Sequence, residues 1–88
     1  MQSMAIAVTY DFRDPVARYD RALRLLPELA DQPGRRSHLC TLTDDGFVVL
    51  EVWDTQASYE RFFRTFLAVM AEVGLSCAPR VSAVHHYM

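Results

Sequence analysis

The chain contains no lysine and no asparagine among its 88 residues, and its nine basic side chains are all arginine. Without lysine, no side-chain amine can form a Schiff base with a carbonyl compound. Without asparagine, no asparagine amide can hold an oxyanion or a peroxide. Codon bias in a GC-rich genome also produces an all-arginine composition, so the composition excludes some chemistry without pointing to a function.

Long apolar runs, a basic excess and clustered cysteines are also absent. No apolar run approaches the roughly 20 residues that a membrane-spanning helix needs, and no charged start precedes an apolar stretch as in a secretory signal. The net charge of −2 comes with no basic stripe of the kind that binds nucleic acid. Cys40 and Cys77 lie far apart in no metal-binding spacing, which favours two small buried thiols. We therefore expect a cytoplasmic protein without a nucleic-acid or membrane partner.

The spacing of apolar residues predicts four strands and two helices. Asp14-Pro15 is typical of a helix start, with a cap residue before proline at the first helical position, and Pro27 should end or kink that helix. Asp44-Asp45-Gly46 reads as a hairpin turn. We expect strands over 5–10, 37–42, 47–53 and 81–87, and a second helix from a cap at Asp54 or Thr55 to Val73, with Gly74 as its stop.

These elements follow the order βαββαβ. The hairpin makes the second and third strands antiparallel, and right-handed crossovers place both helices on the same face of the sheet. The sequence therefore predicts an α+β, ferredoxin-like fold with a four-stranded antiparallel sheet. We expect one domain over residues 5–88, after a flexible start at residues 1–4.

The expected strand over 47–53 is apolar on both of its faces. Successive side chains of a strand point to opposite sides, so Val48 and Leu50 lie on one face while Val49 and Trp53 lie on the other. Two helices can cover only one face, and an exposed apolar sheet face is unusual for a monomer. We therefore expect a homodimer that packs through the open sheet face. The alternative is a monomer with an unusually apolar surface.

Strand pairing also predicts where polar side chains meet. If the hairpin loop has two or four residues, His38 and Cys40 share a face with Val49, Glu51 and Trp53, whereas a three-residue loop would separate them. A buried carboxylate needs a partner, and a histidine beside a carboxylate can act as a general base near neutral pH. We expect His38 as the catalytic base, Glu51 as the group that orients it and Trp53 as an aromatic wall. The alternatives are a solvated or arginine-paired Glu51 and a Trp53 that belongs to the core.

Aromatic residues of the second helix and a histidine of the last strand complete the expected pocket. His85 and His86 are adjacent in a strand, so at most one of them can face it. A two-histidine metal site with His38 matches no known spacing, and we expect neither a metal nor another cofactor. Leu67 and Met70 continue the apolar face of the helix. The ligand-binding residues that we expect are Val49, Cys40, Tyr59, Phe62, Phe63, Phe66 and His85.

The segment Val48-Val49-Leu50-Glu51-Val52-Trp53-Asp54, followed by Tyr59, Phe62 and Phe63, resembles the dimeric α+β-barrel superfamily. The chain is most similar to the antibiotic biosynthesis monooxygenase-like domains of that superfamily, over residues 5–86. The motif is a strand that ends in acidic-x-Trp, then a helix with aromatic residues, and a last strand that ends in a Val-His pair. The resemblance implies a dimeric α+β barrel with a ligand pocket between the helices and the sheet.

The resemblance also implies roles for single residues. Trp53 and Tyr59 match the strand tryptophan and the helix tyrosine of the cofactor-free oxygenases in this group. Two positions depart from the relatives: Val49 stands in place of an asparagine four residues before the tryptophan, and Phe63 stands in place of the haem-ligating histidine of the haem-degrading relatives. The first departure weakens the oxygenase assignment, and the second argues against haem.

These residues together predict a small-molecule enzyme. The expected reaction is natural-product tailoring of a small hydrophobic or aromatic, polyketide-like ligand, by cofactor-free oxygenation or by general-base cyclisation or isomerisation. One alternative is a non-catalytic module for ligand binding or dimerisation, which a cavity below roughly 300 Å³ would favour. The other alternative is a metal- or haem-dependent oxygenase.

Overall fold

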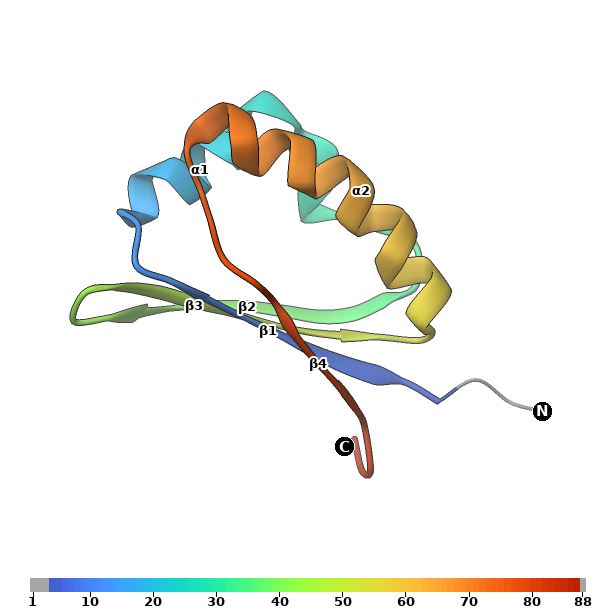
Figure 1. The fold of residues 1–88 in the computed structure, drawn as a ribbon. Helices are drawn as coiled ribbons and strands as arrows, with labels where there is room; N and C mark the ends of the chain where they lie inside the picture. Colours follow the sequence, from blue (N-terminus) through green and yellow to red (C-terminus); the bar gives the residue numbers. More distant parts are fainter. Residues whose placement is uncertain (1–3, 88) are drawn as a thin grey trace.

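The computed structural model describes residues 4–87 and shows a four-stranded antiparallel sheet with a helical layer on one side (Figure 1). The strand order is β2-β3-β1-β4. The predicted ferredoxin-like α+β fold is confirmed. Of the flexible start expected at residues 1–4, all but Met4 lies outside the described residues. The elements are β1 (Ile6–Phe12), α1 (Val16–Leu25), the 3₁₀ helix η1 (Pro27–Ala30), β2 (Arg35–Thr43), β3 (Gly46–Trp53), α2 (Gln56–Val73) and β4 (Arg80–Ala83).

The β2–β3 hairpin sets the register on which the site depends. Thr43 pairs with Gly46, so the loop has two residues, one of the two cases that bring the predicted site together. His38 then pairs with Glu51, and the two side chains share a sheet face. Gly46 tolerates no larger residue, because a Cβ there would lie 1.9 Å from the backbone oxygen of Phe12 on β1.

The two long helices begin in different ways. The Thr55 hydroxyl caps α2 by accepting a hydrogen bond from a backbone N–H of the first turn at 3.1 Å, and Gly74 ends the helix at φ 80°. The expectation that Asp14 caps α1 is wrong, because Pro15 occupies the cap position and no side chain caps this helix. The Asp14 carboxylate instead accepts a hydrogen bond from Ser76 N at 3.2 Å. It thereby ties the chain after α2 to the start of α1.

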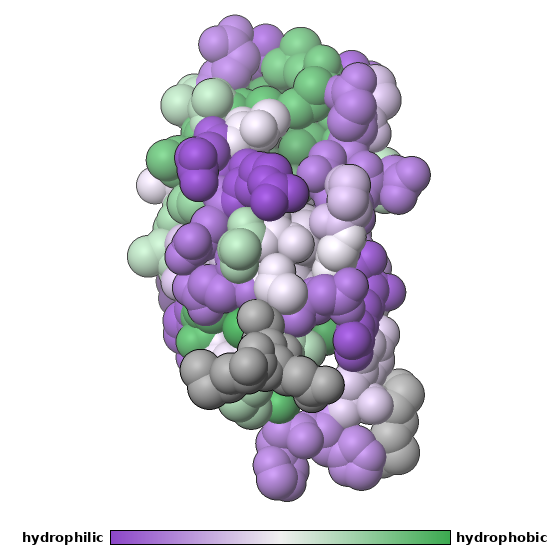
Figure 2. Space-filling model, turned by 90° about the vertical axis from the view of Figure 1, so that its right-hand side faces the viewer, coloured by the Kyte–Doolittle hydropathy of each residue, from purple (hydrophilic) through white to green (hydrophobic). Residues whose placement is uncertain are grey.

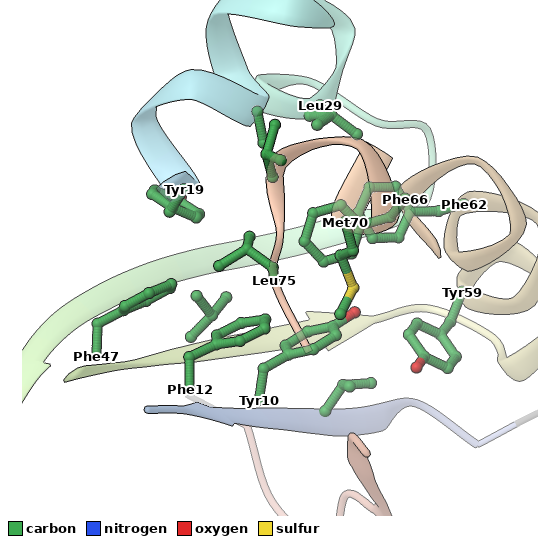
Figure 3. Packing of buried hydrophobic residues seen from close by; sticks show 14 of the residues in the cluster. Tyr10, Phe12, Tyr19, Leu29, Phe47, Tyr59, Phe62, Phe66, Met70 and Leu75 are labelled. Atoms are coloured by element: carbon green, nitrogen blue, oxygen red, sulfur yellow. The ribbon is translucent and has the colours of Figure 1, made fainter. Parts of the chain in front are cut away.

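The core lies between the sheet and the helices (Figure 3). Tyr10, Phe12 and Phe47 project from the sheet toward the helical layer, where Phe62 and Phe66 of α2 lie. The rings of Phe12 and Phe47 stack with 4.7 Å between centroids, and Tyr10 meets Phe66 edge-on at 5.7 Å. One sheet face is therefore an aromatic core that a single chain closes by itself.

The other sheet face has no covering element among residues 4–87 (Figure 1). Leu39 and Leu50 pair across β2 and β3 and are 54% and 42% exposed. Val48 and Val52 of β3 are only partly buried on the same face. The predicted apolar face that the chain itself leaves uncovered is therefore confirmed.

Two expectations about the C-terminal half are wrong. β4 ends at Ala83, not at Tyr87, because it pairs only with β1 and its last partner is the first residue of that strand. His85 and His86 therefore follow the sheet as exposed residues. Leu67 is 52% exposed, since it lies beside the buried stripe of α2 and not within it.

Figure 2 shows one side of the molecule, where hydrophobic surface at the level of the helical layer is framed by polar residues. No helix among the described residues is both long and apolar enough to cross a membrane.

Candidate active site

A buried carboxylate, Glu51 of β3, organises the polar residues on the sheet face under the helices. Its side chain is 1% exposed. Oε2 accepts hydrogen bonds from His38 Nδ1 at 2.8 Å and from Arg35 Nη1 at 3.2 Å, and Oε1 accepts one from Trp53 Nε1 at 3.1 Å. A guanidinium thus balances the buried charge and three donors bind it, as a stable buried carboxylate requires.

Tyr19 of α1 extends this network beyond the histidine. Its hydroxyl is hydrogen-bonded to His38 Nε2. Burial, with smaller contributions from Cys40 and Glu51, raises the pKa of Tyr19 to about 12, so the phenol keeps its proton at neutral pH. Because the Glu51 carboxylate only accepts, neutral His38 carries its proton on Nδ1 and accepts from Tyr19 at Nε2. The result is a chain of hydrogen bonds from Tyr19 through His38 to Glu51.

Arg35 reaches the site through a β-bulge that sequence reasoning missed. It pairs with Trp53 of β3, but the register shifts between Arg35 and Ser37, which makes Arg36 the extra residue. Strict alternation would place residues 35 and 38 on opposite faces, and nothing in the apolar pattern marks the bulge. With the bulge, the Arg35 side chain lies beside Glu51, with its guanidinium carbon 5.9 Å from the Trp53 ring centre.

The network adjoins a small cavity under the helices. Its volume is about 10 Å³, roughly the room for one water molecule. A depression of about 190 Å³ on the solvent side shares Arg35 and His38 with the cavity, so these side chains lie between the two spaces. A groove of about 450 Å³ between η1 and α2 shares Phe62 with the cavity. The apolar part of the cavity wall is completed by Ala22, Leu23, Leu29, Val49 and Phe66.

The structure gathers half of the predicted site residues at this cavity. Trp53 takes part through its indole N–H on Glu51, behind the cavity wall. The predicted residues that line the cavity are His38, Glu51, Val49, Phe62 and Phe66.

Four predicted ligand-binding residues lie elsewhere. Tyr59 and Phe63 pack behind the wall, with 5.6 Å between their ring centres. Cys40 is half-buried on β2 and does not line the cavity. His85 is exposed beyond the end of β4, so the expectation that it faces the pocket is wrong.

Two tyrosines near Glu51 had no role in the sequence prediction. Tyr19 lies with Ala22 on the buried face of α1, a position that gives no sign of its contact with His38. Tyr10 of β1 is fully buried, and its hydroxyl is the one buried side-chain oxygen or nitrogen in residues 4–87 without a hydrogen-bond partner. Burial, followed by the charge of Glu51, raises the pKa of Tyr10 well above its ordinary value. Alternation along β1 places Tyr10 on the same face as Val8 and Phe12, and this pattern could have predicted its burial.

No family model matches the chain, and no curated protein matches it by sequence. A protein from Caulobacter crescentus that carries the provisional name antibiotic biosynthesis monooxygenase superposes with a TM-score of 0.70 at 19% identity, over 98% of this chain and 92% of that one. SnoaB, a cofactor-independent oxygenase from Streptomyces nogalater, gives 0.65 at 14% identity, over 100% of this chain and 98% of its own. The fold is that of the antibiotic biosynthesis monooxygenases.

A third solved structure that superposes on the chain is MupZ from Pseudomonas fluorescens. It matches with a TM-score of 0.68 at 12% identity, over 96% of this chain and 74% of its own. The resemblance predicted from the sequence is confirmed at the level of the fold. Identities this low do not carry residue roles from one protein to another, so the roles of His38 and Glu51 rest on the geometry of this chain.

On this antibiotic biosynthesis monooxygenase fold, the site offers an oriented base. No three His, Cys, Asp or Glu side chains within residues 4–87 are arranged to hold a metal ion. His38 is held by Glu51 on one side and meets Tyr19 on the other, so its ring orientation and proton position are fixed. This arrangement can accept a proton at Nε2 and stabilise the imidazolium that results.

Proposed function

We propose that this chain is a small-molecule enzyme in which His38 removes a proton from a weakly acidic, hydrophobic or aromatic ligand. The observation that carries the proposal is the hydrogen-bonded chain from Tyr19 through His38 to Glu51, at the wall of a cavity in an otherwise apolar layer. Well-packed apolar side chains can replace a buried polar network without loss of stability. A network that runs from a tyrosine through a histidine to a carboxylate therefore suggests a catalytic role.

The Tyr19 hydroxyl marks the position that the ligand's acidic proton must take. In this structure the hydroxyl is hydrogen-bonded to Nε2 of His38, the nitrogen that would accept the proton. A ligand O–H or C–H that replaces the phenol there lies within reach of the base, and Glu51 stabilises the imidazolium after transfer. In this proposal the ligand displaces the Tyr19 hydroxyl from His38 Nε2.

The deprotonated ligand can cyclise or isomerise, and an electron-rich phenolate can react with dioxygen without a cofactor. SnoaB, which shares the fold, is a cofactor-independent oxygenase. The names of other proteins with this fold refer to antibiotic biosynthesis. We infer natural-product tailoring of an aromatic, polyketide-like ligand. Val49, where the sequence departs from the oxygenases, favours cyclisation or isomerisation over oxygenation.

The ligand needs more room than the small cavity provides. Phe62 lines both the cavity and the groove between η1 and α2, so its movement would join the two spaces. The groove of about 450 Å³ lies within the size range of small-molecule pockets. We therefore infer that the ligand enters from the groove.

A non-catalytic module for ligand binding or dimerisation is the second candidate function. The cavity of about 10 Å³ lies far below the roughly 300 Å³ of typical ligand pockets. The ion pair with Arg35 also gives Glu51 a purely structural partner. The open sheet face would then be the functional surface.

Both candidate functions fit a homodimer that packs through the open sheet face. The helices α1 and α2 both lie on the other face, and the exposed Leu39 and Leu50 leave this one apolar. A two-fold contact between identical faces would cover these leucines in both copies.

The substitution His38→Ala distinguishes the two functions. Wild-type protein and variant are incubated with a panel of phenols and 1,3-dicarbonyl compounds, while oxygen uptake and exchange of the acidic C–H for deuterium are followed. We expect the variant to be slower by about 10²–10⁴-fold, the usual contribution of a general base. His85→Ala is the matched control, because this histidine is exposed and does not line the cavity. A wild-type rate in His38→Ala, or no turnover of any compound by the wild-type protein, would favour the module.

A further inference from the structure

We propose that Arg35 is a further ligand-binding residue, which holds an anionic oxygen of the ligand in the depression between η1 and β2. The depression measures about 190 Å³ and is lined by residues 30–32 and 35–38. The inference rests on the proposed proton transfer to His38, which lines the same depression. It specifies the ligand as a weak acid whose conjugate base carries its charge on oxygen.

The Arg35 guanidinium has hydrogen-bonding capacity that the protein does not use. It carries several N–H donors, and among the described residues its one hydrogen bond runs from Nη1 to Glu51. The side chain is nevertheless only 6% exposed. Nε and Nη2 keep some accessible surface, because Tyr10 holds the only fully buried and unpartnered side-chain polar atom within residues 4–87. Arg35 lines both the cavity and the depression, so a ligand in either space would lie beside the guanidinium.

The guanidinium is held in position before a ligand binds. Its carbon lies 5.9 Å from the Trp53 ring centre and 5.8 Å from that of Phe62, within the range of cation–π contacts. Together with the ion pair to Glu51 at 3.2 Å, these contacts leave little side-chain freedom to lose on binding. A planar fork of N–H donors fits two oxygens at once, as in a carboxylate or the enolate of a 1,3-dicarbonyl compound.

Charge balances during the proposed transfer. When a ligand X–H gives its proton to His38 Nε2, the ligand becomes X⁻ and the imidazole becomes an imidazolium, so the net charge of the site does not change. Glu51 then faces the imidazolium, and Arg35 faces the ligand anion. Phenols and 1,3-dicarbonyl compounds meet this requirement, because both place the negative charge on oxygen.

Two other charged side chains line the depression and provide matched controls. Arg36 is already paired with Asp54 and lies next to Arg35 in sequence. Asp31 is exposed and carries a negative charge, which repels an anion in the depression. Arg36→Gln therefore controls for loss of any nearby cation, and Asp31→Asn should strengthen anion binding.

Binding of benzoate and of benzamide, measured by isothermal titration calorimetry at low salt, tests the inference. The two molecules have nearly the same shape and differ in charge. We expect the wild-type protein to bind benzoate at least about tenfold more tightly than benzamide, because a charge-assisted, two-point hydrogen bond is the stronger kind. Arg35→Gln should abolish this preference, Arg36→Gln should keep it and Asp31→Asn should increase it.

A measurement on the wild-type protein covers the case in which Arg35→Gln does not fold. The Nε–H signal of Arg35 in a nitrogen-15 NMR spectrum, identified by its proximity to Trp53, should shift with benzoate and not with benzamide. Equal binding of the two probes, a preference that survives Arg35→Gln, or no benzoate binding in the millimolar range would overturn the inference. Benzoate binding requires no proton transfer, so none of these results decides whether His38→Ala slows turnover. The inference about Arg35 and the proposed function can therefore fail separately.

Discussion

At the scale of single residues, Glu51 shows how one buried charge determines its neighbours. A carboxylate that is 1% exposed is stable only with a nearby cation and with donors for its oxygens. Arg35, His38 and Trp53 supply them. Removal of any of these donors would also destabilise the fold, so a change in stability does not distinguish a structural role from a catalytic one. Turnover and anion binding do distinguish them.

Tyr19 makes the stability of the folded chain sensitive to alkaline pH. The pKa of the folded phenol is about 12, against 10.0 for an ordinary tyrosine. As pH rises through about 10, the unfolded chain loses this proton while the folded chain keeps it, so the free energy of unfolding falls. The loss should approach about 2–3 kcal/mol near pH 12, and it should be absent below about pH 9.

Urea unfolding of Tyr19→Phe across this pH range measures the effect. The variant should lose less free energy of unfolding than the wild-type protein between about pH 9 and about pH 12. Tyr87→Phe, which alters an exposed tyrosine, should behave as the wild-type protein does. Parallel pH profiles for wild type and Tyr19→Phe would show that Tyr19 is not buried as described.

At the scale of elements, the sequence predicted regular strands well and irregular connections poorly. The Asp-Gly turn and the alternation of β3 predicted that His38 shares a sheet face with Glu51 and Trp53 if the loop has two or four residues, because the register of a hairpin follows from its loop length. The structure has the two-residue loop and pairs His38 with Glu51. The bulge that brings in Arg35 was not predictable, since one inserted residue leaves the apolar alternation on either side intact. Tyr19 was also missed, because its contact with His38 depends on how α1 packs on the sheet.

The length of β4 illustrates the same limit. The apolar pattern of residues 81–87 suits a strand, but a strand extends only as far as its partner does. β1 begins at Ile6, and β4 therefore ends at Ala83. Edge strands of this kind are determined by the pairing, which a local pattern does not contain.

Gly46→Ala tests the close approach of β3 to β1. A Cβ at this position would lie 1.9 Å from the backbone oxygen of Phe12, so β3 would have to move away from β1. We expect a loss of about 1–3 kcal/mol in the free energy of unfolding, measured with urea. Thr43→Ala alters the exposed partner of Gly46 across the hairpin and should change stability by less than about 0.5 kcal/mol. An equally small change in Gly46→Ala would contradict the close approach of β1 and β3.

At the scale of the whole molecule, the sheet has one face that its own helices close and one that they leave apolar. Exposed leucines on β2 and β3 mark the second face. The candidate site lies on the first face, so a second copy could cover the open face without touching the cavity. Dimer formation and proton transfer are therefore separable by mutation.

Leu50→Glu tests the dimer directly. Sedimentation equilibrium of the wild-type protein at micromolar concentration should give twice the chain mass of 10.1 kDa. A glutamate at this position would bring two unpaired charges into a contact between apolar sheet faces, so the variant should sediment as a monomer. Leu67→Glu is the matched control: Leu67 is 52% exposed on α2, on the helical side of the molecule, and its variant should remain a dimer. A well-folded wild-type monomer at this concentration would contradict the two-fold contact and leave the open face exposed in solution.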